Sequence, residues 1–228
     1  MTVFSELGKV LVVAPHPDDE VLGCGGSLAR FAKLGIEVHV LVATQGQPPL
    51  FSIEDIVQDR NELLAAHTVL GVTRTHHLNL PAAQLGTKEV AEVNAQIGEA
   101  IEAISPDTIF LPFVGDIHVD HKIVFDAAMV AVRPRHDKAP RTVLCYETLS
   151  ETNWYAPPST PAFMPNVFID IAETLATKIE AFREFESQVR AFPEERSIEA
   201  IEALARTRGA TNHLFAAEAF MNIRQILR

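Results

Sequence analysis

The sequence predicts an α/β fold with a mostly parallel, Rossmann-like sheet and helices on both of its faces. Short apolar segments alternate with longer amphipathic segments along the chain, as in repeated strand–helix units. The apolar segments are nearly continuous, which is typical of parallel strands buried on both faces. The chain has 228 residues, enough for one large core, so we expect a single domain over residues 1–228.

Six segments are expected to form strands. The first, KVLVVA, is an apolar run that stops abruptly at Pro15. Later segments are rich in apolar, β-branched residues, which favour strands. The expected strands are 9–14, 37–44, 73–80, 107–113, 141–148 and 166–171.

Six amphipathic segments between and after these strands predict helices. Ser52 can cap the second helix and Gly71 can end it, while Gly35 can end the first. Residues 153–166 contain four prolines and are predicted to form a loop within the domain. The expected helices are 20–34, 52–71, 87–104, 120–132, about 172–187 and about 197–208.

The composition argues against several classes of partner. The net charge of −11 argues against nucleic acid or an anionic membrane, since both attract basic surfaces. No apolar run is long enough to span a bilayer, and the N-terminus lacks the pattern of a signal peptide. Cys24 and Cys145 form no CxxC pair, which fits a reducing compartment. We therefore expect a cytoplasmic protein whose partner is a small molecule.

A histidine and three carboxylates follow the first strand directly, in PHPDDE at 15–20. In open α/β sheets, ligands bind at the carboxyl ends of the strands where strand order reverses, usually beside the first strand. The carboxylates would also suit the positive N-terminus of the next helix, so an acidic helix cap is the simpler alternative. A dinucleotide site fits poorly, because GCGG at 23–26 lacks the G-x-G-x-x-G spacing.

A second cluster decides between these alternatives. His118, Asp120 and His121 follow the fourth expected strand. In a sheet of order 3-2-1-4-5 the first and fourth strands are neighbours, so both clusters would meet in one crevice. Imidazole and carboxylate groups suit zinc, whose catalytic sites hold three protein ligands and keep an open position. The two clusters together therefore predict a metal site between these strand ends.

With these two motifs the chain resembles the LmbE-like, or PIG-L, family of zinc-dependent de-N-acetylases. PHPDDE is similar to the first motif of that family, and HVDH at 118–121 is similar to its second motif, HxDH. Weaker similarity extends to three further segments, so the resemblance covers nearly the whole chain. These segments are RNELLAAHTVLGV, KIEAFREFESQ and RGATNHLFAAEAF. The resemblance implies an activity like that of N-acetylglucosaminyl deacetylases.

Position by position, the resemblance implies a zinc ion bound by His16, Asp19 and His121. Another divalent metal is the alternative in the cell, because availability often decides which ion a site holds. Bound zinc lowers the pKa of water to about 7 and polarises a carbonyl oxygen, which is the chemistry that amide hydrolysis needs.

The same resemblance implies catalytic roles for neighbouring residues. Asp18 becomes the general base, and His118 becomes the general acid or the stabiliser of the oxyanion, with Asp120 orienting it. A carboxylate that does not bind the metal can accept a proton from water. A protonated imidazole can stabilise the oxyanion and then protonate the departing amine. Glu20 keeps a structural role at the start of the helix.

Two further residues are predicted to bind substrate. The resemblance implies that Arg60, in the second helix, reaches a sugar hydroxyl or phosphate; a solvated helical arginine is the alternative. Trp154 and Tyr155 lie in the proline-rich loop, where an aromatic ring could stack on a sugar. The alternative for Trp154 is a contact with the core or with another subunit, so a homo-oligomer stays open.

We therefore predict a metal-dependent hydrolase that removes an acetyl group from a small N-acetylated sugar or sugar conjugate. The sugar itself is left open, because the chain departs from the family pattern at Ala82, Ala83, Asp116 and His213. An amidase acting on another small amide is a close alternative. A catalytically silent metal- or sugar-binding module is a second alternative, but such a module would have no need of Asp18.

Overall fold

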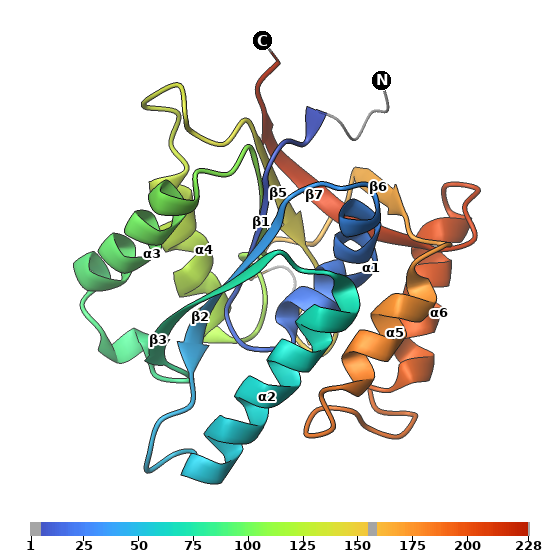
Figure 1. The fold of residues 1–228 in the computed structure, drawn as a ribbon, viewed down its shortest axis with the longest axis horizontal. Coiled ribbons are helices and arrows are strands. Elements are labelled where there is room, and N and C mark those ends of the chain that lie inside the picture. Colours follow the sequence, from blue (N-terminus) through green and yellow to red (C-terminus); the bar gives the residue numbers. More distant parts are fainter. Residues whose placement is uncertain (1–5, 155–158, 228) are drawn as a thin grey trace.

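The computed structural model describes residues 6–154 and 159–227. The described residues form one seven-stranded sheet in the order β3-β2-β1-β4-β5-β7-β6, with helices on both faces (Figure 1). The predicted α/β fold and the order 3-2-1-4-5 of the first five strands are confirmed. Strand order reverses between β1 and β4, which is where ligands bind in sheets of this kind.

The first five strands run parallel, and the last two are antiparallel to their neighbours. Val12 of β1 pairs with Val40 of β2 on one side and with Phe110 of β4 on the other. Strand β7 pairs antiparallel with both β5 and β6. The strands are β1 (Val10–Ala14), β2 (Val38–Gln45), β3 (Arg74–Pro81), β4 (Thr108–Pro112), β5 (Thr142–Tyr146), β6 (Val167–Asp170) and β7 (Ala217–Gln225).

Strand β7 differs from the sequence-based expectation, which placed no strand after residue 171. Its first four residues are buried, whereas the following five are partly or fully exposed. The segment therefore has neither a continuous apolar run nor a strict alternation, the two patterns by which a strand is found in a sequence. It lies between β5 and β6 and so joins the end of the chain to the sheet.

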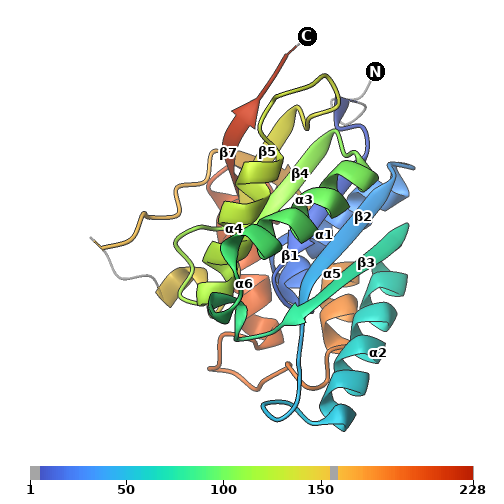
Figure 2. The ribbon, with the colours of Figure 1, turned by 90° about the vertical axis from the view of Figure 1, so that its left-hand side faces the viewer.

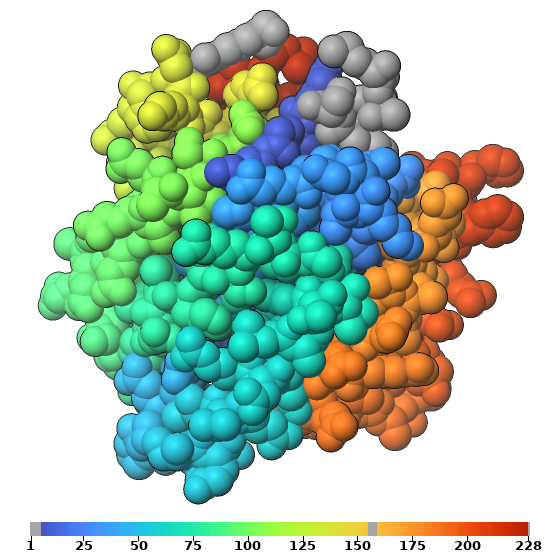
Figure 3. Space-filling model, in the orientation of Figure 1, coloured from blue at the N-terminus to red at the C-terminus, as the bar shows by residue number. Residues whose placement is uncertain are grey.

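The helices form two layers around the sheet. Helices α3 and α4 cover the face that carries Leu11 and Val13 (Figure 2). The other helices cover the face that carries Val10 and Val12. Figure 3 shows α2 in cyan against α5 in orange, and these two helices are in contact. The helices are α1 (Asp19–Lys33), α2 (Ile53–Leu70), α3 (Val90–Ile104), α4 (Val119–Ala131), α5 (Leu175–Arg183) and α6 (Ile198–Ala210).

The helix ends follow the local sequence signals in one case and depart from them in another. The caps expected for α2 are confirmed: Ser52 accepts a hydrogen bond from Asp55 N, and Gly71 ends the helix with a φ of 75°. Helix α5 ends at Arg183, before the expected residue 187. The chain after α5 then brings Phe185 to the pocket beside β1. None of the described helices is long and apolar enough to cross a membrane.

The start of α1 packs tightly onto the sheet. A Cβ atom on Gly23 would lie 2.3 Å from Tyr146 Cδ2, so this position accepts only glycine without a shift of the ring. The Tyr146 hydroxyl donates a hydrogen bond to Val13 O at 2.9 Å. These contacts hold the N-terminus of α1 at the carboxyl end of β1.

Candidate metal centre

The turn after β1 separates two adjacent carboxylates. Asp18 has a φ of 105°, which residues other than glycine rarely adopt, and its carbonyl oxygen accepts hydrogen bonds from the first turn of α1. Asp19 begins the helix, and its Oδ2 accepts a hydrogen bond from His16 N at 2.8 Å. Asp19 therefore faces the histidines of the site, whereas Asp18 faces Arg196.

The second motif reaches the same place from the end of β4. His118 is the N-cap of α4, and its Nδ1 accepts a hydrogen bond from Asp120 N at 3.1 Å. The ring centroid of His16 lies 4.5 Å from that of His118 and 5.3 Å from that of His121. The expectation that the two motifs meet in one crevice is confirmed, because β1 and β4 are paired neighbours in the sheet.

The three residues expected to bind metal form a compact group. Asp19 Oδ2 lies 3.3 Å from His16 Nδ1 and 3.2 Å from His121 Nε2. His121 is fully buried, and its Nε2 has no hydrogen-bond partner among the described residues. A buried polar atom without a partner is costly, and a bound cation would satisfy it. The ligand atoms lie close enough together to hold a metal ion.

In His16 and His121, one ring nitrogen faces Asp19. The second ring nitrogen of each contacts a carboxylate from outside this group. His16 Nε2 lies 3.2 Å from Asp120 Oδ2, and His121 Nδ1 lies 2.8 Å from Asp116 Oδ2. Asp116 is itself fixed by Thr152, whose hydroxyl donates to Asp116 Oδ1 at 2.6 Å. Histidines that bind metals usually have such an outer acceptor, because it fixes the ring and leaves the inner nitrogen free to coordinate.

Asp120 is placed differently from the expectation. We expected it to orient His118, but its carboxylate accepts hydrogen bonds from Ala83 N at 2.7 Å and Leu85 N at 3.2 Å and contacts His16. The hydrogen bond between Asp120 and His118 runs through the Asp120 backbone N–H. The cause is the helix cap, since His118 turns to the N–H groups of α4 while the Asp120 side chain extends towards β1.

A second possible ligand group, His16 with His118 and Asp120, overlaps the first. Its carboxylate already accepts two backbone hydrogen bonds and contacts an imidazole. The group around Asp19 is therefore the better candidate for the metal.

Burial and the nearby carboxylates set the charges of the group. Burial by itself lowers the pKa values of His16 and His121, but the carboxylate contacts outweigh it and raise them to about 9 and about 10. Burial alone would raise the pKa of Asp19, yet the two histidines hold it well below its usual range. A cation must displace the imidazole protons, so its binding should strengthen as pH rises.

Arg196 is a residue of the site that sequence reasoning missed. Its Nη1 donates to Asp18 Oδ2 at 2.8 Å and to Gln188 Oε1 at 2.6 Å, and its Nε donates to Ser150 Oγ at 2.9 Å. Burial raises the pKa of Asp18 to about 8, although Arg196 opposes the rise. No local pattern marks Arg196, because the fold alone brings it to Asp18 across 178 residues of sequence.

A pocket of about 220 Å³ opens beside the two motifs. His16, Asp18 and His118 line it, together with the rings of Phe51 and Phe185. It therefore joins the proposed chemical groups to apolar walls that a small organic ligand can pack against.

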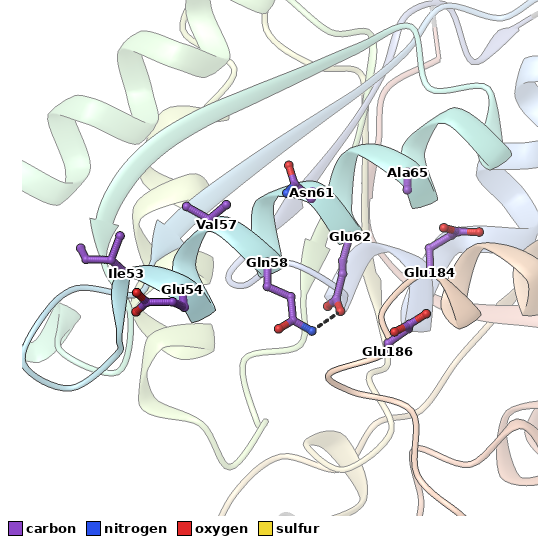
Figure 4. A pocket seen from close by; sticks show the side chains of 9 residues that line it. All are labelled: Ile53, Glu54, Val57, Gln58, Asn61, Glu62, Ala65, Glu184 and Glu186. Atoms are coloured by element: carbon purple, nitrogen blue, oxygen red, sulfur yellow. Dashed lines mark hydrogen bonds between the residues drawn. The ribbon is translucent and has the colours of Figure 1, made fainter.

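A larger open groove of about 690 Å³ runs along α2 (Figure 4). Figure 4 shows Gln58 and Glu62 joined by a hydrogen bond, with Glu184 and Glu186 beyond them. No residue of either His/Asp motif lines this groove. We therefore assign the chemistry to the smaller pocket.

The residues expected to bind substrate lie outside that pocket. Arg60 is on the exposed face of α2, whereas the preceding residue, Asp59, lines the pocket. Successive residues of a helix point about 100° apart, so neighbours can face a pocket and solvent respectively. Trp154 is 59% exposed, and its indole N–H donates to Glu195 Oε2 at 2.9 Å. Tyr155 falls outside the described residues.

Glu20 is buried away from the metal group. His67 Nε2 lies 3.1 Å from Glu20 Oε1, and His67 Nδ1 lies 2.6 Å from Thr75 Oγ1. This chain of contacts joins α1, α2 and β3, which supports the structural role expected for Glu20.

Comparison with known proteins gives matches along most of the chain. The model of the family PIG-L, described as GlcNAc-PI de-N-acetylase, matches residues 11–132. An uncharacterized deacetylase of Escherichia coli, YaiS, is 33% identical over 188 residues, covering 78% of this chain and 90% of that protein. The diacetylchitobiose deacetylase of Thermococcus kodakarensis is 28% identical over 207 residues, covering 84% of this chain and 73% of that protein.

Solved structures share the fold. The conserved protein TT1542 of Thermus thermophilus is similar with a TM-score of 0.77 at 25% identity, over 96% of both chains. The 4-carboxy-2-hydroxymuconate hydratase GalB of Pseudomonas putida has a TM-score of 0.76 at 17% identity, over 97% of this chain and 98% of that one. Since proteins with this fold carry different names and activities, the residues of the site must decide the reaction.

Proposed function

This chain belongs to the PIG-L family of deacetylases, and from that premise we propose that it hydrolyses the acetyl group from a small N-acetylated sugar or sugar conjugate. The proposal includes a divalent cation, zinc as first candidate, held by His16, Asp19 and His121. The observation that carries it is the buried His121 Nε2, which faces Asp19 at 3.2 Å and lacks a hydrogen-bond partner among the described residues. When bound, zinc lowers the pKa of water and polarises a carbonyl oxygen.

Asp18 serves as the general base. Its carboxylate lines the pocket, next to the ligand Asp19 but directed at a different partner. Burial raises its pKa to about 8, which suits a group that must both accept and return a proton near neutral pH. Arg196 holds the carboxylate in place through one hydrogen bond of 2.8 Å.

His118 stabilises the oxyanion that forms when water attacks the amide. It lines the pocket, and because its Nδ1 accepts a hydrogen bond from Asp120 N, the proton of the neutral ring resides on Nε2. Burial and the neighbouring His16 lower the pKa of His118, which favours this neutral donor over a charged acid. The proton that Asp18 takes from water is then available for the departing amine.

Two alternatives lead to different outcomes in a direct test. An amidase would use the same groups on an amide that is not part of a sugar. A silent binding module would hold the metal without turnover, but it leaves no purpose for a strained Asp18 placed beside the ligands in the pocket wall.

The test measures acetate and free amine released from a panel of N-acetylated sugars that includes N-acetylglucosamine and N,N′-diacetylchitobiose. We expect release that is lost when a chelator removes the metal and restored when zinc is added back. His121→Ala should abolish both zinc binding and release, whereas His136→Ala, at an exposed position, should change neither. Release that survives complete metal removal would contradict the proposed site, and cleavage of non-sugar amides alone would favour the amidase.

A further inference from the structure

Asp59 lies in the pocket wall, and its carboxylate has no hydrogen-bond or ion-pair partner among the described residues. It lies on α2 and lines the pocket of about 220 Å³, and its side chain makes no hydrogen bond or ion pair within residues 6–154 and 159–227. Burial, together with the nearby charges of Glu62 and Asp55, raises its pKa. The carboxylate has lost part of its hydration without gaining a donor, so a ligand that donates a hydrogen bond to it would be stabilised.

Arg196, the arginine that lines this pocket, is already surrounded by acceptors. Arg196 pairs with Asp18 at 2.8 Å and donates to Gln188 at 2.6 Å, and a second nitrogen lies 3.9 Å from Glu151. A negatively charged ligand would therefore meet two acidic side chains beside this arginine, and a third acidic side chain, Asp59, in the same pocket wall.

The size and the walls of the pocket limit what it can take. Its volume of about 220 Å³ lies below the roughly 300–1,000 Å³ of sites for drug-sized ligands, so it suits a single sugar ring. Phe51 and Phe185 supply apolar surface for the C–H face of such a ring. The hydroxyl groups of the ring then need acceptors, and the carboxylate of Asp59 is one.

We propose that Asp59 determines substrate specificity, by accepting a hydrogen bond from a hydroxyl of a neutral N-acetylated sugar and repelling sugars that carry phosphate or carboxylate. The inference rests on the proposed function and adds to it the charge class of the substrate. Like charges repel more strongly in a partly desolvated pocket than in water, so one carboxylate is enough to discriminate about tenfold or more. Arg60 does not oppose this effect from within the pocket, because it is not among the residues that line it.

The experiment compares N-acetylglucosamine with its 1-phosphate and 6-phosphate. Values of kcat/KM come from acetate release by the zinc-loaded protein, and calorimetry measures the binding of the products glucosamine and glucosamine 6-phosphate. We expect the unmodified protein to prefer the compounds without phosphate by about tenfold or more in both measurements. Asp59→Arg should remove or reverse this preference, and Asp59→Asn should weaken it.

The control is Glu54→Arg, which makes the same change of charge on the same helix, in the neighbouring groove of Figure 4. It should leave the preference unchanged, and melting temperatures will show whether each variant is folded. Equal use and binding of neutral and phosphorylated compounds, or a preference that Asp59→Arg does not alter, would overturn the inference. Absence of acetate release from every sugar would instead count against the proposed function, and the binding measurement would still decide the role of Asp59.

Discussion

Asp18 and Asp19 are chemically identical neighbours, and the backbone between them decides what each one does. The positive φ of Asp18 turns its carboxylate to Arg196, while Asp19 enters α1 with its carboxylate between two histidines. Asp18→Asn should therefore retain bound zinc but lose roughly 100- to 10,000-fold in kcat, the usual cost of removing a general base. Metal analysis and steady-state kinetics on the same preparation check both parts.

Asp19→Asn is the matched variant, and it should lose metal. If Asp18→Asn emptied the site while Asp19→Asn kept it full, the two roles would be reversed. If both variants kept metal and activity, neither carboxylate would take part in the reaction.

Asp116 is expected to act on the metal indirectly, through His121. Its carboxylate contacts Nδ1 of His121, the ring nitrogen that does not face Asp19. Asp116→Asn should lower zinc affinity by about 10- to 100-fold, the effect usually seen when an outer partner of a metal-binding histidine is changed. Competition with a coloured chelator measures that affinity without reference to activity. Asp126→Asn, in an exposed ion pair on the same helix as His121, is the control and should leave the affinity unchanged. An unaltered affinity in Asp116→Asn would give this residue no role in orienting the ligand.

At the scale of elements, the packing of α1 against the sheet positions the first motif, PHPDDE at 15–20. Gly23→Ala places a methyl group 2.3 Å from the Tyr146 ring and should cost about 1–3 kcal/mol of unfolding free energy through overpacking. Gly98→Ala in α3 meets only an ordinary contact at 3.9 Å, so the gain in helix propensity should stabilise the protein by about 0.5–1 kcal/mol. Urea unfolding of the two variants measures both effects. A Gly23→Ala protein as stable as the parent would show that the helix shifts without cost.

The segment after α5 links Trp154 to the site. Glu195 accepts the indole N–H of Trp154 at 2.9 Å, and the next residue, Arg196, holds Asp18. If ligand binding alters this link between Trp154 and the pocket, adding a substrate or product should change Trp154 fluorescence saturably, near the KM of the substrate. Trp154→Ala should then weaken substrate use with little loss of melting temperature, since the side chain is 59% exposed. If the fluorescence did not change when ligand was added, and Trp154→Ala changed the oligomeric state, Trp154 would be assigned to a subunit contact instead.

At the scale of the whole molecule, the metal group joins two strand ends, so occupancy should stabilise the entire fold. A ligand at 100 times its Kd adds about 2.7 kcal/mol, which for a protein of this size corresponds to a rise of about 5–10 °C in Tm. Removing the metal should lower Tm by that amount, and zinc should restore it in the parent protein but not in His121→Ala.

This gain in Tm should depend on pH in a defined direction. The pKa values of His16 and His121 are raised to about 9 and about 10, so in the absence of a cation both rings are protonated at neutral pH. A cation must displace these protons, and the gain should therefore grow as pH rises towards 9 and shrink as pH falls. Calorimetric melting at several pH values, with and without zinc, measures it. A gain that is constant from pH 6 to pH 9 would contradict the raised pKa values.

Local patterns were sufficient to predict the six strands up to residue 171, the six helices and the meeting of the two motifs, but not strand β7. Each expected strand up to residue 171 is present, because strand segments that alternate with helical segments indicate a parallel sheet. His16 and His121 come together because their motifs directly follow strands that pair in such a sheet. The sequence by itself therefore determined the fold class and the location of the candidate metal group.

Only the tertiary structure decided which residues surround that group. Arg196 reaches Asp18, and the carboxylate of Asp120 turns to His16, through contacts between segments more than 100 residues apart. The choice between Asp59 and Arg60 depends on which side of α2 faces the pocket, and the pocket exists only once α2 has packed with the segments that line it. Periodicity and motif spacing are properties of neighbouring residues, so they carry no information about contacts that arise only when distant elements pack together.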